Sequence, residues 1–145
     1  MSLYLLDTNI ISNMMHDPRG LAAQRALALN QHATDTPLCT SVIVDCELRY
    51  GLARKPLARL LAAYERTIET LTILPLDNAV AQTYAAMRHS LTASGQGLDA
   101  NDTLIAAHAL SLDATLVSAD VAFARVPGLK LENWLQAITL SGGDR

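Results

Sequence analysis

Short apolar segments alternate with longer helical segments along this 145-residue chain, and this alternation limits the possible folds more than any other feature. Apolar runs bounded by turn residues predict buried strands, and the longer segments between them predict helices. The predicted strands span residues 3–6, 37–40, 71–76, 114–118 and 129–131. The predicted helices span residues 20–33, 42–52, 56–70 and 78–94, and a last one runs from Asp99 or Asn101 to Leu112. This order predicts an α/β fold with a mostly parallel central sheet and helices on both faces.

Residues that begin and end helices support this division. Ser41, Asp77 and Asp99 each precede a predicted helix and carry an oxygen that can cap it. Gly95 predicts the end of the helix over residues 78–94. The turn-forming sequence Asp-Thr-Asn at residues 7–9 ends the first strand, so no helix is predicted before residue 20.

The length of the chain fits one domain, which we expect to cover residues 1–140, with residues 141–145 (SGGDR) as a flexible tail. No run approaches the roughly 18 apolar residues of a membrane span. The N-terminal sequence MSLYLLDTN lacks the basic and long apolar regions of a secretory signal. We therefore expect a cytoplasmic protein in which Cys39 and Cys46 are reduced thiols.

The charge of the chain limits how it can bind nucleic acid. Charged residues make up 17% of the chain and the net charge is −3, whereas an average soluble protein has about 25% charged residues. So few charges predict an apolar surface that a partner or a second copy covers. An acidic protein that acts on a nucleic acid needs a cation between its carboxylates and the phosphates.

Two aspartates follow predicted strands, at the sheet edge where α/β proteins place their sites. Asp7 ends the first strand, and Asp120 lies two residues beyond the strand over residues 114–118. Thr8 and Asn9 can orient the Asp7 carboxylate or a bound water. The alternative is that Asp7 only forms a turn, which is a common role of aspartate at strand ends.

Two further acids are predicted on helices. Glu47 lies in the mainly apolar segment VIVDCELRYG, and Asp102 lies three residues after the predicted cap Asp99. Glu47 can instead lie on a solvated helix face, and Asp102 can simply stabilise the helix dipole. If several of these carboxylates meet, they repel one another, and a hard divalent cation such as Mg²⁺ or Mn²⁺ compensates the repulsion.

Four motifs occur in order: LLDTNIIS at 5–12, CELRYG at 46–51, NDTLIAAHAL at 101–110 and LVSAD…FARVPGL at 116–129. Together they resemble the VapC toxin group of PIN-domain ribonucleases, over nearly the whole chain to Trp134. The resemblance implies a PIN-like α/β/α sandwich. It also implies an endoribonuclease that depends on Mg²⁺ or Mn²⁺ and is inhibited by a VapB-like antitoxin.

The resemblance also implies which residues form the site. The catalytic and metal-binding acids of the family fall on Asp7, Glu47, Asp102 and Asp120. Thr8 and Ser118 match hydroxyls that the family often places near the metal, with Asn9 beside them. Asp99 stands where the family frequently has glycine or another small residue. In many members the last acid is asparagine or is shifted by one residue.

The predicted function is therefore that of the toxin of a type II toxin–antitoxin system, cutting structured RNA (transfer or ribosomal RNA) with metal-activated water. The predicted partners are a VapB-like antitoxin, the RNA and a second copy in a homodimer, with no membrane. The alternative is a catalytically degenerate PIN fold that binds RNA or protein, which would require a missing acid. Arg54, Lys55 and Arg59 either contact phosphates or form a solvated turn.

Other α/β families with an aspartate after the first strand fit less well. Haloacid-dehalogenase-like phosphatases need a second aspartate where this chain has Asn9. Phospho-receiver domains need a lysine near the acids, and neither Lys55 nor Lys130 follows a suitable strand end. The four histidines show no spacing typical of an acid–base pair.

Overall fold

The computed structural model describes residues 3–32 and 37–137. Within these residues, five parallel strands form one sheet in the order β3–β2–β1–β4–β5. The strands are β1 Tyr4–Leu6, β2 Leu38–Ser41, β3 Thr72–Leu74, β4 Thr115–Val117 and β5 Lys130–Glu132. The predicted tail, residues 141–145, lies outside the described residues.

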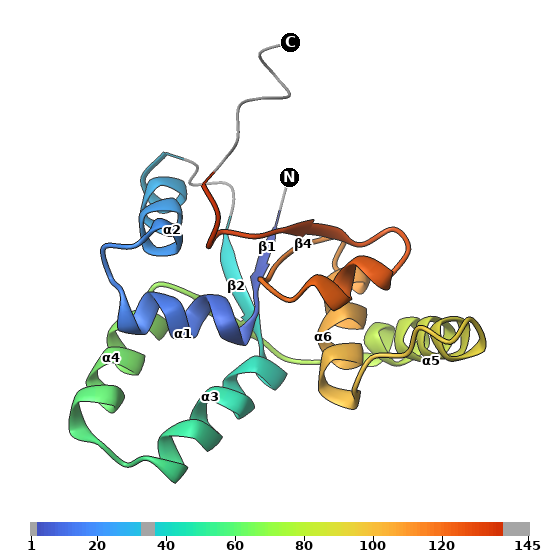
Figure 1. Ribbon diagram of the computed structural model, residues 1–145, viewed down its shortest axis with the longest axis horizontal. Helices are drawn as coiled ribbons and strands as arrows, with labels where there is room; N and C mark the ends of the chain where they lie inside the picture. The colour runs from blue at the N-terminus through green and yellow to red at the C-terminus, as the bar shows by residue number, and fades with distance from the viewer. Residues whose placement is uncertain (1–2, 33–36, 138–145) are drawn as a thin grey trace.

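Helices cover the sheet on both sides, so the predicted α/β/α sandwich is confirmed. They are α1 Thr8–His16, α2 Leu21–His32, α3 Val42–Arg54, α4 Ala58–Ile68, α5 Asn78–Ala93, α6 Ala100–Ser111 and the 3₁₀ helix η1 Val121–Arg125. Figure 1 shows α1, α2 and α4 on one side of the strands and α5 and α6 on the other. Helix α3 lies beyond the ends of the strands, where it contacts both α1 and α6. No helix in residues 3–32 and 37–137 is both long and apolar enough to cross a membrane.

The local helix signals are confirmed. Ser41, Asp77 and Asp99 each accept a hydrogen bond from a backbone N–H in the first turn of the helix that follows. Gly95, just after α5, has a φ of 72°, the left-handed conformation that glycine adopts without strain. Helix α4 begins at Ala58, two residues after the predicted start at Pro56.

Helix α1 was not predicted, because the Asp-Thr-Asn sequence is typical of a turn. In the structure Asp7 instead caps a nine-residue helix directly after β1. Such a short helix is marginal by itself and depends on burial of an apolar face. The buried residues of α1 are Ile10, Ile11, Met14 and Met15. The information missing from the local sequence is tertiary: these residues belong to the hydrophobic core, and α1 packs against α2, α3 and α4.

The register of the sheet aligns the ends of three strands. Leu6, at the end of β1, pairs with Thr40 on one side and with Val117 on the other. The side chains of Leu5 and Leu6 are fully buried, as expected for a central strand covered on both faces. Because the strands are parallel and in register, the residues that follow β1, β2 and β4 emerge at one edge of the sheet.

Candidate active site

Asp7 lies at this edge and is held by donors from the start of α1 and from the residue after β4. It is only 4% exposed. Its Oδ1 accepts a hydrogen bond from the Thr8 backbone N–H at 2.8 Å. Its Oδ2 accepts from Ser118 Oγ at 2.7 Å and from Asn9 Nδ2 at 3.3 Å. The carboxylate therefore has a fixed orientation, and the three residues predicted beside it, Thr8, Asn9 and Ser118, all contact it.

A small network extends from Asp7 towards Asp120. Asn9 Oδ1 accepts from the Ala119 backbone N–H at 3.0 Å, and Ser118 Oγ accepts from the Asp120 backbone N–H at 3.1 Å. Asp120 Oδ1 in turn accepts from the Ala122 backbone N–H and caps η1. The segment after β4 is thus held against the start of α1, and Asp120 lies beside Asp7 at the same edge.

Glu47 on α3 points towards this edge. Its Oε1 accepts a hydrogen bond from Thr8 Oγ1 at 2.6 Å, and its Oε2 accepts from Asn101 Nδ2 at 3.5 Å. These contacts connect α3 to the first turns of α1 and α6. Glu47 is half-buried, so the alternative of a solvated helix face does not describe it.

The contact between Asn101 and Glu47 was not predicted, because the sequence suggested Asn101 only as a residue that could begin a helix. Its position next to Asp102 in the motif NDTLIAAHAL could have indicated that Asn101 lies near the site. The cap of α6 is Asp99, whose Oδ1 accepts from the Asp102 backbone N–H at 2.8 Å. Asp102 is half-buried in the first turn of α6.

The charges of the acids affect one another's pKa values. Burial raises the pKa of Asp7 above 3.8, hydrogen bonds from Ser118 and Thr8 lower it, and the charges of Glu47 and Asp120 raise it again. The pKa of Asp102 is raised to about 7, first by burial and then by four neighbouring carboxylates. In falling order of effect these are Asp99, Asp7, Asp120 and Glu47. Asp7, Asp120 and Glu47 therefore lie within electrostatic range of Asp102.

The arrangement fits a hard divalent cation by its chemistry. Among residues 3–32 and 37–137, no three histidine, cysteine or acidic side chains are arranged as a group that could hold a metal ion directly. Mg²⁺ keeps several of its waters and is usually held by only one or two carboxylates. Burial, and after it the neighbouring carboxylates, raise the pKa values of Asp7 and Asp102, and a hydrated cation would offset the negative charge at these acids. All the donors are oxygen atoms, which Mg²⁺ and Mn²⁺ prefer.

This repulsion should be measurable as a pH-dependent stability. The pKa of Asp102 is about 7 in the folded protein against an ordinary value of 3.8. Its contribution to stability is therefore present at low pH and is lost as the pH rises through about 7. We expect Asp102→Asn to raise the urea midpoint of the protein in EDTA at about pH 8, and to change it little below about pH 4.

Asp77→Asn is the matched control. Asp77 is exposed, caps α5 through the Ala79 backbone N–H and is not among the charges that act on Asp102, and asparagine also caps helices, so this change should have little effect on the urea midpoint at either pH. An Asp102→Asn variant that is less stable than the wild type at the higher pH would contradict the assigned repulsion.

The histidine and the basic cluster considered in the sequence lie elsewhere. His108 is buried in α6, with Nδ1 at 2.9 Å from Ser41 Oγ, and burial lowers its pKa. It therefore packs between α6 and the start of α3. Arg54, Lys55 and Arg59 are exposed around the turn between α3 and α4.

Comparison with known proteins agrees with this architecture. Residues 4–129 match the PIN domain family. The Ribonuclease VapC2 of Haemophilus influenzae is 33% identical, over 91% of this chain and 98% of that protein. The Ribonuclease VapC2 of Rickettsia felis is 30% identical over the same shares.

Solved structures show the same fold. VapBC2 from Rickettsia felis, bound to a DNA fragment from its promoter, superposes with a TM-score of 0.84 at 29% identity over 91% of this chain and 98% of that one. DNA-bound VapBC from Salmonella typhimurium gives a TM-score of 0.80 at 31% identity, over 92% and 99%. With the parallel sheet and the acids at its carboxyl edge, these matches show that the chain belongs to the PIN-domain family, in its VapC group of ribonucleases.

Proposed function

We propose that this chain is a metal-dependent endoribonuclease and the toxin of a type II toxin–antitoxin pair. The observation that carries the proposal is the half-buried Asp102, whose pKa is raised to about 7 by burial and by the neighbouring carboxylates, among them Asp7, Asp120 and Glu47. PIN-domain ribonucleases generally depend on divalent metal ions. The VapC relatives, which cover nearly the whole chain, are named as ribonucleases.

Asp7, Glu47, Asp102 and Asp120 would hold the cation, which we propose to be Mg²⁺ or Mn²⁺. When bound, that cation supplies a Lewis acid and an activated water for hydrolysis of a phosphodiester. Asp7 is the most restrained of the four, because Ser118 and Asn9 both donate to its Oδ2. The retention of all four acids argues against the degenerate alternative.

Thr8, Asn9 and Ser118 would act on the acids rather than on the substrate. Thr8 contacts two of them, donating its backbone N–H to Asp7 and its hydroxyl to Glu47. It thereby fixes the spacing between the strand-end acid and the helical acid. Groups that orient metal ligands commonly change metal affinity by roughly tenfold or more when they are removed.

The proposed partners follow from the relatives and from the surface. The similar structures are VapBC complexes, so we propose a VapB-like antitoxin as a partner and the cytoplasm as the site of action. Several apolar side chains are exposed, as the low charge content predicted, and can be covered by the antitoxin and by a second copy in a homodimer. They include Leu21, Leu27, Leu57, Leu61 and Val121. We propose a structured RNA, transfer or ribosomal, as the substrate.

The ends of the RNA fragments test this proposal. Hydrolysis by metal-activated water leaves a 5′-phosphate and a 3′-OH, and does not require the 2′-OH at the cut. We expect fragments from the purified protein and Mn²⁺ to ligate directly to a 3′-OH acceptor without kinase treatment. Sequencing these 5′ ends would also identify the RNA that is cut.

A different pair of fragment ends would contradict the proposal. Ribonucleases that use the 2′-OH as nucleophile with a pair of acid–base groups leave a 2′,3′-cyclic phosphate and a 5′-OH. His108, the buried histidine, contacts Ser41 rather than the acids. Fragments with cyclic phosphate ends would therefore exclude the proposed chemistry even though the fold is that of the family.

A further inference from the structure

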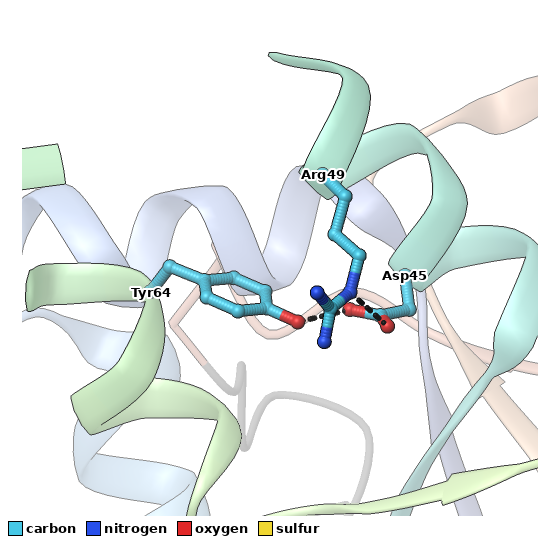
Figure 2. Close-up of polar contacts among 3 residues, drawn as sticks. All are labelled: Asp45, Arg49 and Tyr64. Carbon is cyan, nitrogen blue, oxygen red and sulfur yellow. Dashed lines mark hydrogen bonds and ion pairs between the residues drawn. The ribbon is translucent and has the colours of Figure 1, made fainter. Parts of the chain in front are cut away.

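A second polar cluster, formed by Asp45, Arg49 and Tyr64, lies outside the four-acid site (Figure 2). Tyr64 Oη donates a hydrogen bond to Asp45 Oδ1, and Arg49 Nε donates to Asp45 Oδ2 at 2.8 Å. Asp45 is 7% exposed and Tyr64 is 4% exposed. A buried carboxylate costs free energy unless it is fully paired, so both donors are needed to keep it in place.

The two donors differ in what they connect. Arg49 is on the same helix as Asp45, one turn further along α3. Tyr64 is on α4, so its hydroxyl makes the polar link between the two helices. Helix α4 also packs along α1, the helix that Asp7 caps.

Glu47 lies on the opposite side of α3 from this link. Two residues of an α-helix are about 200° apart around its axis, so Asp45 and Glu47 point in nearly opposite directions. Asp45 is bonded to Tyr64 on α4, and Glu47 is bonded to Thr8 on α1. Helix α3 is thus held by a polar contact on each side, and rotation of α3 at one contact would displace the other.

We propose that Tyr64 and Asp45 are positioning residues for the candidate metal site, acting through Glu47. Their hydrogen bond fixes the rotation of α3 against α4 and thereby sets where the Glu47 carboxylate meets Thr8 and Asp7. This inference rests on the proposed function and adds to it two residues that touch neither the cation nor the RNA. Stability alone does not account for the cluster, because well-packed apolar residues are often as stabilising as a buried charged pair. A need to fix the rotation of α3 against α4 does account for the cluster.

The test is the Mn²⁺ affinity of Tyr64→Phe, which removes only the hydroxyl. Free Mn²⁺ is measured by its electron paramagnetic resonance signal, which disappears on binding and does not depend on RNA cleavage. We expect the dissociation constant to rise about fivefold, somewhat less than when a group bonded directly to a metal ligand is removed. Cleavage at low Mn²⁺ should fall accordingly and should recover at saturating Mn²⁺.

Tyr84→Phe is the matched control. The hydroxyl of Tyr84 on α5 is hydrogen-bonded as well: it accepts from Arg88 Nη1 at 2.7 Å. The Arg88 guanidinium lies over the Tyr84 ring, as that of Arg49 lies over the ring of Tyr64. Both residues belong to α5, which packs against α6. We therefore expect the same loss of a hydroxyl at Tyr84 to leave Mn²⁺ affinity unchanged.

A double substitution tests whether Tyr64 acts through Glu47. If it does, Tyr64→Phe should weaken Mn²⁺ binding about fivefold in the wild-type background and less than about twofold in the Glu47→Gln background. An equal loss in both backgrounds would mean that Tyr64 acts by general loosening of the fold, which would overturn the inference.

The remaining outcomes separate this inference from the proposed function. If the wild type binds no Mn²⁺, both are overturned together. If the wild type binds Mn²⁺ and cleaves RNA, but Tyr64→Phe lowers only the thermal unfolding midpoint, the proposed function stands and the positioning role is wrong.

Discussion

Asp7→Asn is expected to reduce RNA cleavage by about a thousandfold or more while the protein stays folded. The substitution keeps the size of the side chain and its ability to cap α1 through the Thr8 N–H. It removes the charge of the acid that is most buried and most restrained in the site. Because a neutral side chain relieves both the desolvation and the repulsion at this position, the variant should be at least as stable as the wild type.

Asp99→Asn provides the comparison for Asp7→Asn. Asp99 makes the same kind of capping bond, to the Asp102 N–H, but it is exposed. Asparagine caps nearly as well, so cleavage should stay within about twofold of the wild type. Initial cleavage rates at saturating Mn²⁺ measure the activity of each variant, and thermal unfolding measures its stability. Loss of activity in Asp99→Asn with retention in Asp7→Asn would show that the acids are assigned wrongly.

Removal of divalent cations is the second change with a large expected effect. We expect EDTA to abolish cleavage, because the four carboxylates repel the phosphate as well as one another unless a cation lies between them. Activity should return with Mg²⁺ or Mn²⁺. It should not return with Ca²⁺, whose larger and less regular coordination shell misplaces the reacting water.

The EDTA experiment needs a test of folding alongside it. The circular dichroism spectrum in EDTA should match that with Mn²⁺, since the core of the fold is built from buried apolar side chains. Undiminished cleavage in EDTA, after dialysis to remove bound ions, would contradict the metal mechanism whatever the result for Asp7.

The strands, the helix caps and the candidate acids at strand ends could be predicted from the sequence, because each depends on neighbouring residues. The apolar run before Asp7 predicted β1, and Ser41, Asp77 and Asp99 marked three helix starts that the structure confirms. The parallel order of short strands and longer helices then placed Asp7 and Asp120 at one edge, since parallel strands all end on the same side.

Tertiary structure decided what the local pattern left open. Helix α1 follows a turn-like sequence and forms because Ile10 and Ile11 are buried between the sheet and other helices. Helical periodicity supported a buried and a solvated Glu47 equally, and the contact with Thr8, 39 positions away in the chain, decides between them. The bond between Asp45 and Tyr64 was also beyond the sequence, because helical periodicity gives the face of a residue but not which distant helix meets it. Local preferences thus determined the elements, and packing between distant segments determined the geometry of the site.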